Sequence, residues 1–373
     1  MGSSNVVSKI KAEIKDIART RPFKGSLGNS AFWSSKLAAL LSICSGASNF
    51  TDVDILNFAL NLECLESEFY SWVAYGKGLA AINSSLVGSG SALTASSSGG
   101  VARSGGSAFS ATAVAIATEI AENEVSHVTF LRDALTAAGA TPVPCPALSL
   151  SPATFTTAAK AAVAAINATI SNTTSATAFN PYASEDAFYL GAYIFEDVGV
   201  TAYKGAVQVL QSQAFATVAA GIEAVEAGHA AIIRDQMFQV AGSPTGLTLS
   251  NGGAIDFQTA VIAINALRDA LGGTSSSTVE APLTKSTAPD LFAADANSVA
   301  YTRIPRQVLN IVYFGTSAGG FFPQGIAGNT NVANVTGAAT TASKTTCTSG
   351  ALSMASASAA MLFAGLAVVY SLV

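Results

Sequence analysis

Charged side chains are scarce in this chain, and histidine is scarcer still. Asp, Glu, Lys and Arg make up 11% of the 373 residues, and there are only two His, four Cys and eleven Pro. The cysteines show no metal-ligand spacing, which argues against a cysteine-bound metal centre. Few prolines interrupt the long alanine-rich stretches, and this composition predicts an all-α fold. Because half of the residues are apolar, the chain can bury a large core.

The charges that are present are unevenly distributed. Seven of the 18 basic residues but only two of the 23 acidic residues precede residue 37, so the remainder holds 11 basic and 21 acidic residues, a formal charge of -10. Nucleic acids are bound largely through their phosphates, so an acidic main body argues against a nucleic-acid partner.

By composition, residues 1–47 form a targeting or signal region. A basic stretch runs into the apolar sequence LAALLSICSGA, in which Ser45 and Ala47 suit cleavage of a secretory signal. The basic stretch is long for such a signal, so an amphipathic organelle presequence over the first 36 residues is the alternative. We therefore expect a secreted or cell-surface protein, with organelle targeting left open.

The chain closes with a Ser/Thr-rich linker at 331–350 and a hydrophobic tail at 351–373. No charge follows Lys344, and small residues (Ser349, Gly350 and Ala351) precede the apolar end, as in a GPI-attachment signal. The alternative is a C-terminal membrane helix, for which about 20 apolar residues suffice. Both interpretations make the membrane a partner. Five N-x-[ST] sequons agree with an extracellular glycoprotein: Asn49, Asn83, Asn167, Asn172 and Asn334.

Cysteine positions define no disulfide framework. Cys44 lies in the targeting region and Cys64 on a predicted helix. Cys145 and Cys347 are the only cysteines in predicted loops, where a disulfide is expected, and whether they pair stays open.

Helical periodicity organises residues 48–245 into a four-helix bundle. The longest segments with few breakers are 51–76, 108–139, 183–212 and 213–241. A Gly/Ser-rich loop at 87–107 joins the first two, and a long connection with a helix near 152–170 joins the second to the third. Two helical hairpins linked by a long crossover is the ferritin-like topology. A C-terminal extension at 246–330 adds a helix over DFQTAVIAINALRDALGG and an irregular region.

Each of the two histidines follows a glutamate by three residues. Glu124 precedes His127 in the second helix, and Glu226 precedes His229 in the fourth. Residues three or four apart share one face of a helix, so each pair aims a carboxylate and an imidazole at the same point. The same stripes hold Ala, Ile, Val and Leu residues, so both pairs should face the core.

The first and third helices each place one glutamate on an apolar stripe, Glu63 and Glu196 respectively. Candidates to support these groups from nearby positions are Glu66, Tyr70, Tyr189, Tyr193 and Tyr203. The other helical acids that we considered fall off these faces and should meet solvent: Glu68, Glu119 and Glu122.

In order, the four helices offer Glu, Glu-x-x-His, Glu and Glu-x-x-His. Di-iron and di-manganese carboxylate bundles use this set, with all six side chains pointing inward. Four buried carboxylates would repel one another and take up protons, whereas two divalent cations would balance their charge. The sequence therefore predicts a di-metal site with six ligands: Glu63, Glu124, His127, Glu196, Glu226 and His229.

Four stretches resemble the ferritin-like proteins grouped as desiccation-related. They are ILNFALNLECLESEFY, FEDVGVTAYKGA, VEAGHAAIIRD and RIPRQVLNIVYFGTSAGGFFPQGIAGN, and the resemblance covers about residues 52–328. It implies a ferritin-like domain with the same six residues at the metal positions. The last stretch lies beyond the bundle and is similar to the family's C-terminal region.

Two interpretations of function stay open. The leading one is a secreted or surface-anchored protein with two iron ions, or manganese, that oxidises Fe(II) or activates O2 or peroxide in stress protection. The other is a non-enzymatic desiccation-related surface protein whose metal is structural or lost. The sequence selects no catalytic residue, substrate or oligomeric state.

Overall fold

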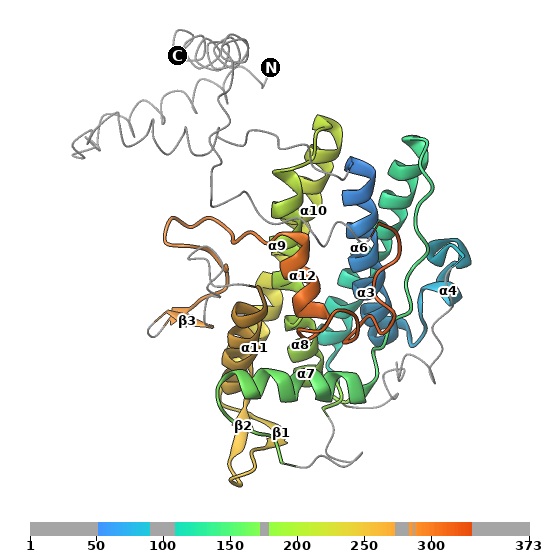
Figure 1. The fold of residues 1–373 in the computed structure, drawn as a ribbon. Helices are drawn as coiled ribbons and strands as arrows, with labels where there is room; N and C mark the ends of the chain where they lie inside the picture. Colours follow the sequence, from blue (N-terminus) through green and yellow to red (C-terminus); the bar gives the residue numbers. More distant parts are fainter. Residues whose placement is uncertain (1–50, 90–108, 172–178, 273–282, 286–287, 330–373) are drawn as a thin grey trace, which may run out of the picture. The chain divides into compact units, whose positions relative to one another are not determined.

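A computed structural model describes residues 51–89, 109–171, 179–272, 283–285 and 288–329 (Figure 1). The bundle consists of α3 (Asp52–Tyr75), α6 (Ala111–Ala137), the consecutive helices α8 (Glu185–Tyr193) and α9 (Glu196–Val207), and α10 (Gln213–Gln239). α3 packs along α6, and α10 packs along α9 and α8. The all-α bundle of two hairpins with a long crossover is therefore confirmed.

Several predicted features lie outside the described residues. They are the targeting region 1–47, most of the Gly/Ser-rich loop 87–107, the linker 331–350, the tail 351–373, Cys44, Cys347, Asn49, Asn172 and Asn334. Of the predicted sequons, Asn83 and Asn167 are described, and both are exposed.

Side-chain caps fix where the bundle helices begin. Thr51 accepts from the amide of Asp54, whose carboxylate accepts from the Thr51 amide, a reciprocal capping box at the start of α3. The hydroxyls of Ser110 and Ser212 cap α6 and α10 by accepting from the amides of Ala113 and Phe215, without the reciprocal bond. α3 ends at Gly76, whose φ of 67° is the left-handed conformation that favours glycine.

The third bundle helix is interrupted, which the periodicity did not predict. α8 ends at Tyr193 and α9 starts at Glu196. Between them the amide of Phe195 bonds to the carbonyl of Ala192, three residues back rather than four. This tighter turn redirects the chain just before Glu196, so that one helix of the bundle is built from two segments.

The crossover contains the predicted extra helix, α7 (Pro152–Ala165), which Ser151 caps and Pro152 begins. It runs crosswise to the bundle helices in Figure 1 and packs against α11 (Phe257–Gly272). The helix is shorter than the predicted 152–170, and Asn167 beyond it has a φ of 58°.

The C-terminal extension, predicted to hold one helix and an irregular region, contains further regular elements. It contains a hairpin of β1 (Pro244–Thr248) and β2 (Ala254–Asp256), then α11, a second hairpin of β3 (Thr284–Lys285) and β4 (Ala288–Pro289), and α12 (Pro305–Val312). Its backbone is tied to the bundle, because the Arg303 amide bonds to the Thr201 carbonyl of α9 at 3.0 Å. The Ala327 amide bonds to the Asn61 side chain of α3 at 2.8 Å. The extension thus covers the side of the bundle formed by α3 and α9.

A disulfide joins Cys64 to Cys145, with the two Cα atoms 5.7 Å apart. The expectation that only cysteines in loops would pair was wrong, because Cys64 lies inside α3 and is fully buried. The crossover passes close enough to α3 for Cys145 to reach it. The short helices α4 (Leu79–Ile82) and η1 (Ser84–Val87) lie beside this link, where the Cys145 amide bonds to the Val87 carbonyl at 3.1 Å.

Among the described residues, α10 is long and apolar enough to span a membrane by length and composition. A core helix passes the same test, and α10 packs along α9 within the bundle. Its position in the bundle is therefore sufficient to explain its apolar character.

Candidate metal centre

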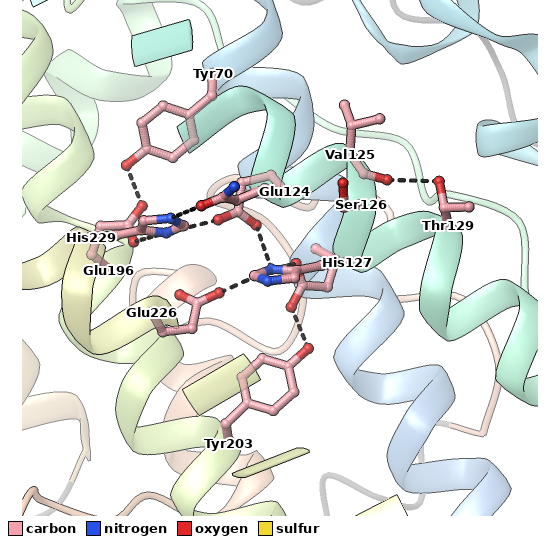
Figure 2. A network of polar contacts seen from close by, with 12 residues as sticks. Tyr70, Glu124, Val125, Ser126, His127, Thr129, Glu196, Tyr203, Glu226 and His229 are labelled. Carbon is pink, nitrogen blue, oxygen red and sulfur yellow. Dashed lines mark hydrogen bonds and ion pairs between the residues drawn. The ribbon is translucent and has the colours of Figure 1, made fainter. Parts of the chain in front are cut away.

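All six residues of the predicted site meet in the middle of the bundle. Glu63 comes from α3, Glu124 and His127 from α6, Glu196 from the first turn of α9, and Glu226 and His229 from α10. Figure 2 shows five of these side chains pointing toward one another: Glu124, His127, Glu196, Glu226 and His229. The four carboxylates are at most 1% exposed, so they lie within the protein core.

The six side chains form two overlapping groups. One contains Glu63, Glu124, His127 and Glu226, and the other contains Glu124, Glu196, Glu226 and His229. Within each group, one potential ligand atom per residue lies within 4.8 Å of all the others. Glu124 and Glu226 belong to both groups, as two carboxylates shared between adjacent ions would.

The imidazoles face this cluster through Nδ1. For His127, Nδ1 lies 3.2 Å from Glu63 Oε2, 3.4 Å from Glu124 Oε2 and 3.5 Å from Glu226 Oε1. For His229, Nδ1 lies 3.1 Å from Glu124 Oε1 and 3.3 Å from Glu196 Oε2. The two oxygens of Glu124 therefore each face a different histidine.

Two tyrosines hold the outer carboxylates. The hydroxyl of Tyr70 donates to Glu196 Oε1 (Figure 2). The hydroxyl of Tyr203 donates to Glu63 Oε1. In both cases the other carboxylate oxygen remains directed at a histidine. The prediction that tyrosines support the carboxylates is confirmed for Tyr70 and Tyr203.

The donor atoms of this cluster fit a metal site. Among the described residues, both oxygens of Glu124 and of Glu226, Oε2 of Glu196 and Nδ1 of His229 are buried without a hydrogen-bond partner. The 3.1 Å approach of Glu124 to His229 is therefore an ion-pair contact that lacks hydrogen-bond geometry. Buried acceptors of this kind are costly unless a cation or a proton satisfies them.

Burial and mutual contacts shift the pKa values of the clustered groups in different directions. Burial raises the pKa of Glu63 to about 7, against the lowering influence of His127. Burial and the neighbouring carboxylates raise the pKa of Glu226 well above its ordinary value. The expectation that crowded carboxylates take up protons fails for Glu124. The two flanking imidazoles outweigh its burial and lower its pKa to about 2. The surrounding carboxylates likewise outweigh burial for His229 and raise its pKa to about 11.

The structure corrects two of the remaining assignments. The hydroxyl of Tyr193 donates to Asn265 at 2.8 Å rather than to a carboxylate of the site. Glu68, expected in solvent, is only 2% exposed and lies against Gly78, where a Cβ atom would overlap its carboxylate. Glu66, a candidate to support the ligands, is buried, and burial and the carboxylates of the site raise its pKa well above the ordinary value. The expectation that Glu119 and Glu122 are exposed is confirmed.

An ion-pair network beside the site was not predicted. Asp197, directly after Glu196, accepts from Arg234 of α10 at 2.8 and 3.1 Å and from Arg268 of α11 at 3.1 Å. Both guanidinium groups also lie over the ring of Tyr193, at 5.3 and 4.7 Å from its centroid. The network anchors the start of α9, and with it Glu196, to two neighbouring helices. The only sign of this network in the sequence was the presence of Arg and Asp within apolar helices.

The imidazoles are the most exposed of the six residues. His127 is 8% exposed and His229 is 6% exposed, and both belong to the pair α6 and α10. These two helices pack less closely on each other than either does on its hairpin partner. Both imidazoles therefore lie slightly nearer the protein surface than the four carboxylates do.

The fold and the cluster together define the class of ferritin-like bundles in which a buried Glu/His cluster fits a metal site. Comparison with known proteins agrees, because the model of the ferritin-like domain family matches residues 51–239. The chain is 30% identical over 268 residues to "Desiccation-related protein PCC13-62" of Craterostigma plantagineum, covering 69% of this chain and 76% of that protein. It is 29% identical over 294 residues to "Ferritin-like catalase Nec2" of Nesocodon mauritianus, covering 76% and 85%. The chain belongs to the ferritin-like family, among its desiccation-related proteins.

Proposed function

We propose that the six clustered residues bind two transition-metal ions, iron or manganese, and that the loaded protein decomposes peroxide. The observation that carries the proposal is the pair of overlapping ligand groups that share Glu124 and Glu226. Carboxylate oxygens and imidazole nitrogen suit both metals, and shared carboxylates keep two ions close together.

Peroxide is favoured as the substrate by the name of one relative, a ferritin-like catalase. In this reaction one peroxide is oxidised to O2 and another is reduced to water, so that 2 H2O2 give 2 H2O and O2 without a further reductant. The bound ions would supply the two-electron redox change. The chain's own residues would position the ions, and the burial of the six side chains excludes bulk water.

Fe(II) oxidation by O2 uses the same ligands and is the second candidate. A site without turnover, in which metal only stabilises the bundle, is the third. It is favoured by the similarity to a desiccation-related protein, whose name states no reaction.

Reconstitution separates these candidates. Metal-free protein is loaded anaerobically with Fe(II) or Mn(II), desalted and analysed for metal, and we expect about two ions per chain. O2 release from peroxide supports the proposal, and faster O2 uptake than by free Fe(II) without such release supports the oxidase. Two bound ions with neither activity leave the structural role, and a metal content near zero rejects the site. Glu124→Ala should abolish any activity, whereas exposed Glu122→Ala should not.

We also propose that the chain follows the secretory route and is held at the cell surface by a GPI anchor. This localisation is supported by the buried Cys64–Cys145 disulfide, since disulfides persist mainly in oxidising compartments. Exposed Asn83 and Asn167 are accessible for glycosylation. A glycosidase-sensitive mass, and release from membranes by a phosphatidylinositol-specific phospholipase, would support it. A mature peptide ending at Val373 would contradict the anchor.

A further inference from the structure

The two ligand groups are related by a pseudosymmetry that the surrounding residues break. Each imidazole presents Nδ1 to the cluster, and each outer carboxylate accepts from a tyrosine. The residue that precedes the shared glutamate differs between the two helices. It is Asn123 on α6 and Val225 on α10.

Asn123 reaches across the bundle to the opposite group. Its Oδ1 lies 3.1 Å from His229 Nε2, the ring nitrogen that points away from the carboxylates. Among the residues that the structure describes, Nε2 of His127 has no corresponding hydrogen bond. Val225, at the equivalent position of α10, is 37% exposed and has no side-chain atom that could accept one.

This difference bears directly on metal binding. An imidazole that binds a cation through Nδ1 carries its proton on Nε2, and an acceptor for that proton fixes the tautomer and the ring orientation. The acceptor also makes Nδ1 a stronger donor, and losing such a partner typically weakens metal affinity about 10- to 100-fold. Of the two imidazoles, only that of His229 receives this support within the described chain.

We propose that the two metal positions are unequal, and that Asn123 is the positioning residue that makes the His229 position the tighter one. The position at His127 is then filled second and emptied first. An ion at the His127 position is also the one more readily exchanged with solvent. This inference rests on the proposed di-metal site and adds an order of occupancy to it.

Calorimetric titration of the metal-free protein with Co(II), a probe that does not react readily with O2, tests the inference, with visible absorption recorded at each addition. The wild type should show two separate binding steps. Asn123→Val should weaken the tighter step about 10- to 100-fold and leave the weaker one unchanged, so that the steps merge. Asn123→Asp keeps an acceptor oxygen and should retain two steps. Val225→Ala is the matched control on the other helix and should behave as wild type.

The outcomes distinguish the inference from the site on which it rests. Two equal steps in the wild type, or equal weakening of both steps by Asn123→Val, would overturn the inequality while leaving a di-metal site. If Val225→Ala weakened the tighter binding step as much as Asn123→Val does, the effect would be a general one of this surface. That result would also overturn the inference. Absence of Co(II) binding in the wild type would reject both. Unfolding temperatures in chelator should be equal for all variants, which excludes misfolding as the cause.

Discussion

Gly199 of α9 faces the carboxylate of Glu226 on α10 so closely that a Cβ atom at position 199 would overlap Glu226 Oε2. The same added atom would lie 3.4 Å from Glu66 Oε1. Glycine is otherwise unfavourable inside a helix, so its presence one turn after Glu196 is explained by the space that Glu226 needs.

Gly199→Ala should therefore displace Glu226. We expect a loss of about 1–3 kcal/mol of stability from overpacking, together with a reduced metal content, because Glu226 belongs to both ligand groups. Gly221→Ala on α10 is the control, since nothing lies within 4 Å of its added Cβ. This control should stabilise the helix by up to about 1 kcal/mol and keep the metal. Full metal content in Gly199→Ala would contradict the steric argument.

Glu226→Gln should separate a metal ligand from a structural carboxyl. Burial and the neighbouring carboxylates raise the pKa of Glu226 and so favour its neutral form, and the neutral amide should therefore change the melting temperature little in chelator. With metal present the variant should melt lower, since a ligand that binds only the native state adds about 2.7 kcal/mol at 100 times its dissociation constant. Exposed Glu122→Gln should have no effect in either buffer. Equal destabilisation with and without metal would identify Glu226 as structural.

The pH dependence of stability should reverse with metal. Folding raises the pKa of Glu63 from 4.5 to about 7. The stabilisation that its protonated form adds to the folded state is therefore present below pH 4.5 and is lost as the pH rises to 7. The pKa of His229, raised from 6.5 to about 11, changes stability in the same direction above pH 6.5. In chelator, melting temperatures should therefore fall between pH 5 and pH 8.

With metal present, an increase from pH 5 to pH 8 should instead raise the melting temperature. The ligands must lose their protons to bind metal, so metal affinity increases with pH. Glu68 lies outside the ligand groups, and burial raises its pKa to about 7. Glu68→Gln should therefore change both profiles by a similar amount. Parallel profiles with and without metal would argue that the cluster binds none.

Removing the disulfide should destabilise the protein without removing a ligand. Cys64→Ala with Cys145→Ala opens a link between residues 81 positions apart and should cost about 2–5 kcal/mol in denaturant unfolding. Metal content should be retained, because neither cysteine belongs to the ligand groups. Peptide mapping of the unreduced wild type should recover the Cys64–Cys145 pair. A peptide that joins Cys145 to Cys347 would contradict the structure.

The site could be predicted because its signal is local. Glutamate and histidine three residues apart on an apolar stripe must share a face, as they do on two of the helices. The other two helices each carry one glutamate on an apolar stripe, and a four-helix bundle has one common interior. The structure brings together all six predicted residues for that reason. Helix boundaries were also predictable where Thr, Ser and Gly supply caps.

What could not be predicted depends on contacts between distant segments. α3 is buried without interruption from Ile55 to Val73, so its stripes do not separate core from solvent, and Glu68 was misplaced for this reason. The pairing of Cys64 with Cys145 depends on the path of the crossover, and the roles of Asp197 and Asn123 depend on partners on other helices. Periodicity within one helix contains none of this information.

The Cys64–Cys145 link and the Asp197–Arg234 pair respond to loss of water differently from the apolar core. Apolar burial stabilises a fold only against liquid water, so drying removes the medium on which that contribution depends. A covalent bond is indifferent to the medium, and Coulomb attraction strengthens as the surrounding dielectric constant falls. One bundle half holds its ligands next to a covalent link and the other next to a buried ion pair. The helices that carry Glu63 and Glu196 are thus held by contacts that depend less on liquid water than the apolar core does.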